Sequence, residues 1–177
     1  VPFAPVWIDL WYRTWHLLLA VLILLVLRLH PAFFAVAAAI KVTPVLGLAY
    51  LVARGRYRDA LIAGFLGFMM LLVSLLISPA AWQQFVDVIG ASAGTVGASI
   101  VPVSFPIRAA TGLLLALAAG RLRPRLGEPV LVIAIVIANP TLWVTALSML
   151  VAIVPLLRSP APEFRGSAPA LLVDASA

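Results

Sequence analysis

The sequence predicts an all-α, polytopic membrane protein with about five or six transmembrane helices. Hydrophobic residues make up 64% of the 177-residue chain, charged residues only 10%, and the mean hydropathy is +1.18. Soluble domains carry roughly 25% charged residues, and no water-soluble core could hide this much apolar surface. The apolar residues also fall in runs that approach the roughly 20 residues a helix needs to cross a bilayer.

The expected spans follow from the lengths of these runs. We place them at residues 14–29, 31–53, 60–78, 107–120, 129–138 and 141–157. The last two come from one apolar block, which is long for a single helix. An interior proline removes a backbone hydrogen bond and clashes with the preceding turn. We therefore expect a turn at Asn139-Pro140.

The arginine clusters predict the sidedness of the loops. One cluster lies at residues 54–58 and the other at 121–125, with two expected spans between them. Both clusters are then on the same side, which the positive-inside rule assigns to the cytoplasm. Residues 79–106 become a long outer loop, where a site is most readily built. The tail at 159–177, rich in Pro, Ala and Ser, is expected to be disordered and cytoplasmic.

Composition and motifs exclude two classes of function. The basic residues form short clusters between apolar runs, whereas a nucleic-acid surface would show a broad basic stripe, so we expect no nucleic-acid partner. Cysteine is absent and there are only two histidines, His16 and His30, so we expect no metal and no cofactor. The chain begins at Val1 with no signal peptide in view, and we interpret it as part of a longer protein.

Lys41 is the only lysine and lies inside an apolar run. An ammonium at bilayer depth costs a few kcal/mol unless it faces a cavity or reaches the interface. It could bind a phosphate or a buried carboxylate, for which an ammonium is a compact partner. Alternatively, it snorkels to the interface while Pro44 kinks the helix.

Two further charged residues are candidates on the outer side. Asp87 is the only acid of the expected outer loop. One carboxylate can serve as a general base, although a solvated loop acid is the alternative. Arg108 opens the fourth span on the outer side, against the positive-inside rule. It could pair with a phosphate through two N–H groups or anchor the end of that helix.

Aromatic residues mark two corners and the entry to the first span. Trp82 and Trp143 end two Pro-x-x-Trp segments at the expected outer interface, where they either anchor the chain or contact a sugar or lipid. Asp9 and His16 stand among several aromatic residues before the first span. That cluster could hold a general base, or it is an interfacial belt, and the expected topology puts it on the cytoplasmic face.

Two segments carry a family resemblance. Ala-Ala-Ile-Lys-Val-Thr-Pro at 38–44, followed by Arg-Gly-Arg-Tyr-Arg-Asp-Ala at 54–60, resembles the Ala-x-x-Lys-x-x-Pro segment and basic loop of glycosyltransferase family 87, membrane enzymes of the GT-C superfamily. The two corners resemble the Ser-Pro-x-x-Trp turns of that family. The resemblance covers about residues 14–157, so the fold it implies is part of a GT-C-like membrane module, the C-terminal half of a typical member.

The resemblance implies a transferase that moves a sugar, commonly mannose, from a polyprenyl-phosphate donor to a lipid-linked or cell-envelope glycan. The family's base is an acid in the first outer loop, which we expect upstream of this chain. Ser104 and Arg108 are the only positions that could match the Asn-Gln-Ser stretch and arginine of the family's long outer loop. The expected substrate-binding or phosphate-binding residues are Lys41, Arg108, Trp82, Trp143 and Ser104.

Localisation and two rival functions complete these expectations. The Arg-rich, Lys-poor, Ala-rich usage is typical of a high-GC bacterium, so we expect a multi-pass protein of the bacterial plasma membrane. A transporter or permease subunit should show paired broken helices, and segments 41–44 and 138–140 could form such a pair. A non-catalytic scaffold would need no intramembrane charge, so Lys41 argues against it.

Overall fold

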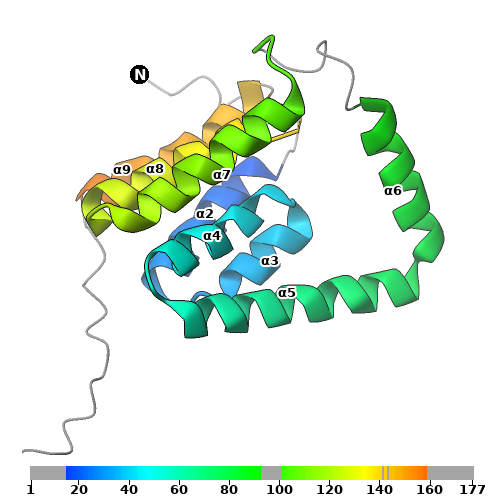
Figure 1. Cartoon of the computed structure of the whole chain (residues 1–177), viewed down its shortest axis with the longest axis horizontal. Helices are drawn as coiled ribbons and strands as arrows, with labels where there is room; N and C mark the ends of the chain where they lie inside the picture. The colour runs from blue at the N-terminus through cyan, green and yellow to red at the C-terminus, as the bar shows by residue number, and fades with distance from the viewer. Residues whose placement is uncertain (1–14, 93–100, 141, 143, 159–177) are drawn as a thin grey trace, which may run out of the picture.

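The computed structural model describes residues 15–92, 101–140, 142 and 144–158, and within these ranges it contains helices and no strand. The all-α prediction is confirmed. Figure 1 shows most of the helices packed in one bundle. In chain order they are α2 (His16–Arg28), α3 (Phe33–Ile40), the 3₁₀ helix η1 (Thr43–Val45), α4 (Leu46–Ala53), α5 (Tyr57–Ile77), α6 (Pro79–Ser92), α7 (Phe105–Arg121), α8 (Pro124–Ile137), the 3₁₀ helix η3 (Val144–Ala152) and α9 (Ile153–Arg158).

Helix α5 is the membrane-crossing candidate in the part of the chain that the structure describes. Its 21 residues are long and apolar enough to cross a bilayer. Ala63 is its one buried residue, so its other apolar side chains are exposed or half-buried. The other apolar helices are shorter, at His16–Arg28, Thr43–Ala53 and Val144–Arg158. Helix length therefore does not confirm five or six spans, and that number stays a prediction.

The second expected span, 31–53, is wrong as a single helix. Helix α3 ends at Ile40, and Lys41 is extended, with φ −152° and ψ 134°. After η1 the chain continues as α4, and the ring of Phe34 fills the space where a side chain at Gly47 would begin. A straight helix would hold these two residues about 20 Å apart. Residues 33–53 thus form a short helical hairpin with its tip at residues 41–45 (Figure 1).

The hairpin decides which helix ends share one end of the bundle. The Arg54 guanidinium donates to the carbonyl of Leu122 at 3.3 Å, and Arg28 pairs with Glu128 at 3.4 Å. The ends of α2, α4 and α7 and the start of α8 therefore meet. We call this the arginine end; it carries Arg28, Arg54, Arg56, Arg58, Arg121, Arg123 and Arg125.

The opposite end of the bundle carries the start of α2, the hairpin tip and the start of α7. Because α2 leaves this end and finishes at the arginine end, the start of the first span and the arginine clusters lie at different ends. For its described residues, Trp15 and His16, the expectation that this start shares a side with the arginine clusters is therefore wrong. The cause is the hairpin. Its two helices bring the chain back to the end of the bundle from which α3 starts, whereas a single span would have crossed to the other end.

Small residues bring α7 close to its neighbours. Gly112, Ala116 and Gly120 follow one another at every fourth position, and all three are buried. A Cβ atom on Gly120 would lie 2.6 Å from the carbonyl oxygen of Tyr50, and one on Gly112 would lie 2.8 Å from that of Ala134. Seams of this kind are typical of helix packing in membranes, where close backbone approach replaces the hydrophobic effect.

Helices α5 and α6 form an arm beside the bundle. Figure 1 shows α5 continuing past the other helices and α6 turning sharply away from its end. The turn is the first Pro-x-x-Trp corner: the indole N–H of Trp82 donates to the hydroxyl of Ser74 at 3.1 Å, and Phe85 packs edge-on against Trp82. Residues 79–92 of the loop expected over 79–106 are therefore helical.

The second corner is confirmed as a break. Helix α8 begins at Pro124, earlier than the expected start at 129, and ends at Ile137. The chain then passes Asn139-Pro140 and continues as η3 and α9. Trp143, the aromatic cluster around Asp9, and the expected tail 159–177 lie outside the described residues.

Candidate functional site

The opposite end of the bundle joins Lys41 to His16. The Lys41 Nζ and the His16 Nε2 lie 2.6 Å apart, from residues 25 positions apart in the chain. His16 is the first residue of α2 and is buried, whereas Lys41 follows the last residue of α3 and is half-buried. Helices α2 and α3 pack against each other, which brings the two side chains together.

The protonation states of this pair follow from elementary chemistry. An ammonium has donors and no acceptor, so a ring nitrogen that bonds to it must offer a lone pair. We therefore assign the Lys41 ammonium as donor and the neutral His16 Nε2 as acceptor, which leaves the imidazole proton on Nδ1. A lone cation in an apolar run has thus gained a polar partner inside the fold.

Arg108 is buried near the same end and is held by backbone carbonyls. Its guanidinium donates from Nε to Val103 at 3.0 Å, from one terminal nitrogen to Asn139 at 2.6 Å and from the other to Pro140 at 2.9 Å. The first turn of α7 thereby caps the break after α8, where the backbone has no helical partner. This geometry matches the helix-anchoring alternative, and the phosphate-binding role stays a prediction.

Two buried polar side chains near this end have no partner within the described residues. They are Thr43, through its hydroxyl, and Asn139, through both atoms of its amide. Thr43 lies in the hairpin tip, and η1 contacts α8, whose C-terminal end leads to Asn139. A buried unsatisfied group costs about 1–3 kcal/mol. The polar character of this end therefore extends beyond Lys41 and Arg108.

The remaining predicted site residues lie elsewhere. Ser104 is half-buried at the start of α7, four residues before Arg108, and makes no side-chain cap bond. Trp82 and Asp87 are on α6, away from the bundle (Figure 1). Asp87 is exposed, and no bond from its carboxylate is found to the described residues. The structure thus brings Lys41 and Arg108 to one end of the bundle and leaves Asp87 on the arm.

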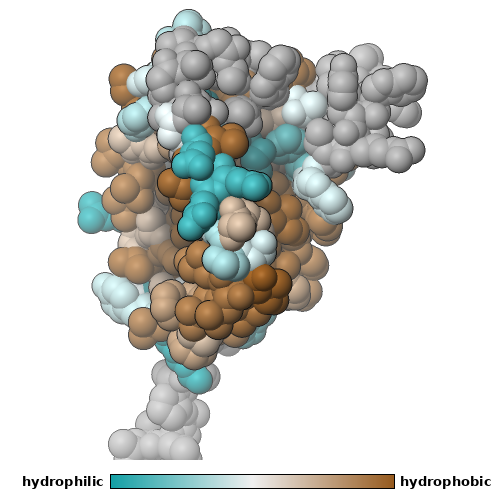
Figure 2. Space-filling model, turned by 90° about the vertical axis from the view of Figure 1, so that its right-hand side faces the viewer, coloured by the Kyte–Doolittle hydropathy of each residue, from teal (hydrophilic) through white to brown (hydrophobic). Residues whose placement is uncertain are grey.

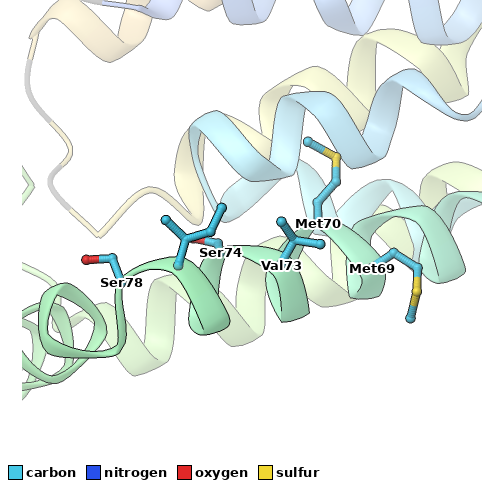
Figure 3. Close-up of a pocket in the computed structure, with 6 residues that line it drawn as sticks. Met69, Met70, Val73, Ser74 and Ser78 are labelled. Carbon is cyan, nitrogen blue, oxygen red and sulfur yellow. The ribbon is translucent and has the colours of Figure 1, made fainter.

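The arm is amphipathic and borders an apolar groove. Gln83, Gln84 and Asp87 are exposed on α6, on the other face from Trp82 and Phe85. Figure 2, viewed from the side of the arm, shows a hydrophilic patch within a largely hydrophobic face. An open groove of about 440 Å³ runs along α5 and is lined by Met69, Met70, Val73, Ser74, Ile77 and, just after the helix, Ser78. Figure 3 labels all of these except Ile77.

Two members of these networks are not predicted by the sequence. The sequence suggests His16 as a neighbour of a possible base, Asp9, and not as a partner of Lys41, and it does not single out Glu128. Glu128 is buried at the arginine end and pairs with Arg28. Its position at the start of an apolar run was the available signal, because an acid there needs a cationic partner.

One comparison with known proteins gives a match. The family model described as Glycosyltransferase family 87 matches residues 1–173, nearly the whole chain. No curated protein and no solved structure matches.

Proposed function

The chain belongs to glycosyltransferase family 87, and we propose that it forms part of a multi-pass enzyme of the bacterial plasma membrane. In this proposal the enzyme transfers a sugar, mannose, from a polyprenyl-phosphate donor to a lipid-linked or cell-envelope glycan. Family membership supports glycosyl transfer in general. The donor, the acceptor and the multi-pass topology are our proposal, and they rest on the observations below.

The Lys41–His16 contact carries the proposal. It places an ammonium at the tip of a hairpin whose two helices are otherwise apolar, at the end of the bundle opposite the arginine end. A compact cation at this place suits the phosphate of a lipid-linked donor. Arg108, whose guanidinium has five N–H donors and uses three in the bonds described above, supplies a second positive charge near the same end.

The arm suits the apolar part of such a donor. The groove along α5 offers methionine and aliphatic surface, and flexible methionines adapt to irregular chains. An amphipathic helix that carries Trp on its apolar face, as α6 does, is suited to lie in the membrane interface. In the proposal, the prenyl chain follows α5 while the phosphate approaches Lys41.

The base that deprotonates the acceptor hydroxyl has one candidate among the described residues of the arm. Asp87 is exposed on α6, so it is held on a helix but is far from enclosed. A general base must come within hydrogen-bond reach of the hydroxyl, and enclosure helps to hold that geometry. We therefore propose that an acid upstream of this chain acts as the base, with Asp87→Asn leaving transfer largely intact.

The test replaces Lys41 in the full-length protein. Membranes carrying Lys41→Ala, supplied with polyprenyl-phosphate mannose and a glycolipid acceptor, should transfer about 10–100-fold less sugar, the loss expected for a bond to a charged group worth about 1.5–3 kcal/mol. Lys41→Arg should keep part of the activity. Arg58→Ala, which removes an exposed cation at the arginine end, is the matched control and should transfer like wild type.

Wild-type transfer by Lys41→Ala would return Lys41 to a structural role. A transporter is the second candidate, because both expected helix breaks, at 41–44 and at 138–140, are present in the structure. It predicts flux of a solute across proteoliposomes that carry the protein, in the absence of any acceptor. Such flux without sugar transfer would favour the transporter.

A further inference from the structure

We infer that His16 is a positioning residue, which holds the Lys41 ammonium in place for an anionic ligand. The inference rests on the proposed function, in which that ligand is the phosphate of a lipid-linked donor. His16 does not itself touch the donor in this scheme. It acts through Lys41.

The geometry gives His16 this role. A lysine side chain has four rotatable bonds, and holding it in one place costs up to about 2 kcal/mol of conformational entropy. The imidazole is buried at the first turn of α2 and has two rotatable bonds, so it forms a rigid acceptor. With Nζ and Nε2 at 2.6 Å, the ammonium is fixed before any ligand arrives. Preorganisation of this kind reduces the cost of binding.

The bond to His16 is compatible with ligand binding. An ammonium has three N–H donors, so the bond to the imidazole does not by itself prevent a contact with a phosphate oxygen. Lys41 is half-buried, and Ile40 and Val42 beside it are exposed, so the hairpin tip can be approached from outside the bundle. The ammonium is therefore both held and reachable.

The same geometry argues against His16 as a general base. The Nε2 lone pair that would accept a proton from a hydroxyl already accepts from Lys41 in our assignment. The second ring nitrogen carries the proton and has no lone pair available. A neutral imidazole next to an ammonium is thus suited to position that cation and not to deprotonate a substrate.

The test uses the single lysine of the chain. The full chain in detergent is treated with an amine-directed reagent, and labelling at Lys41 is read by peptide mass spectrometry, which separates it from the N-terminal amine. Short-chain polyprenyl phosphate without sugar should protect wild-type Lys41 in a concentration-dependent way, and the uncharged polyprenol should not. The protection midpoint measures phosphate binding without any transfer reaction.

Two substitutions of His16 then separate positioning from folding. His16→Leu removes the acceptor and should weaken protection about tenfold, as expected for loss of one hydrogen bond to a charged group. His16→Gln, whose amide oxygen can take the place of Nε2, should restore protection to within about threefold of wild type. His30→Gln is the matched control, because His30 is exposed near the arginine end and the only described bond of its imidazole is accepted from the amide of Ala32.

The outcomes distinguish this inference from the proposed function. Equal protection in wild type, His16→Leu and His16→Gln would overturn the positioning role and leave the phosphate contact of Lys41 standing. Loss of protection in both His16 variants would also overturn it, since a restored acceptor should suffice. Wild-type Lys41 that polyprenyl phosphate does not protect would refute the phosphate contact itself and, with it, the role of His16.

Discussion

Replacement of Arg108 by methionine should destabilise the fold by an amount that its contacts allow us to estimate. The change removes three bonds to backbone carbonyls, at Val103, Asn139 and Pro140. Pro140 is exposed, so its carbonyl can turn to water, but Asn139 is fully buried. A buried acceptor without a partner costs about 1–3 kcal/mol, and the half-buried Val103 adds a smaller share. We expect a loss of about 2–4 kcal/mol.

The assay is thermal unfolding of the full chain in detergent. At about 2–4 °C per kcal/mol for a chain of this size, the unfolding temperature should fall by about 5–15 °C. Arg125→Met, at an exposed arginine of the arginine end, is the matched control and should stay within about 2 °C. If Arg108→Met melted with the control, the capping argument would be refuted. Loss of sugar transfer in such a stable variant would then identify Arg108 as a phosphate ligand.

Three further predictions test the packing, the arm and the orientation. Gly120→Leu should separate α4 from α7 and lower the free energy of unfolding by about 3 kcal/mol. Gly90→Leu is the control and should cost little, because nothing lies within 4 Å of a Cβ atom at that position. Equal melting of the two variants would contradict the close packing of α7 at Gly120. Trp82→Phe removes the indole N–H that bonds at the first Pro-x-x-Trp corner and should speed amide hydrogen exchange in α6 about threefold to tenfold. Unchanged exchange would contradict a stabilising role of this corner. An impermeant thiol reagent added to intact cells should label Gln84→Cys and leave His30→Cys unlabelled, because the hairpin puts residue 30 at the arginine end; the reverse pattern would invert the proposed topology.

Hydropathy predicted the helices that run in one direction and failed at the first place where the chain folds back, residues 31–53. Helix α5 lies at Tyr57–Ile77 against an expected 60–78, and α7 lies at Phe105–Arg121 against an expected 107–120. The run 31–53 has the length of one span, and a hydropathy profile carries no direction, so it cannot tell one long helix from two short antiparallel ones. The signal was present as a cation followed by Pro44, but it was interpreted as a kink.

Helix α6 was missed for a different reason. Its Gln, Asp, Ser and Gly content was interpreted as a loop, yet Trp82, Phe85 and Val86 fall on one helical face and Gln83, Gln84 and Asp87 fall on the other. That spacing is the usual signature of an amphipathic helix. Overall polarity is a weaker indicator than the period at which polar residues recur.

The candidate site was only half predictable. Lys41 and Arg108 could be singled out because a charge in an apolar run is costly wherever it lies. Their distant partners could not, since His16 is 25 residues from Lys41 and two of the three carbonyls that hold Arg108 are 31 and 32 residues away. Contacts at such separations depend on how helices pack, and packing here depends on a hairpin that the local pattern did not reveal.

The short hairpin also gives the site a depth in the membrane. An α-helix rises about 1.5 Å per residue, so the 8 residues of α3 carry the chain only about 12 Å from the arginine end. The 21 residues of α5 rise about 31 Å, enough for the roughly 30 Å of hydrocarbon.

In the proposed orientation, with the arginine end at the cytoplasmic interface, Lys41 then lies well below the outer surface of the membrane, and α5 beside it reaches that surface. A donor phosphate must leave the hydrated interface to meet Lys41, and the loss of water both strengthens the attraction between the two charges and raises their desolvation cost. An ammonium at this depth has to be held by the protein before the phosphate arrives, and the bond to His16 provides that hold.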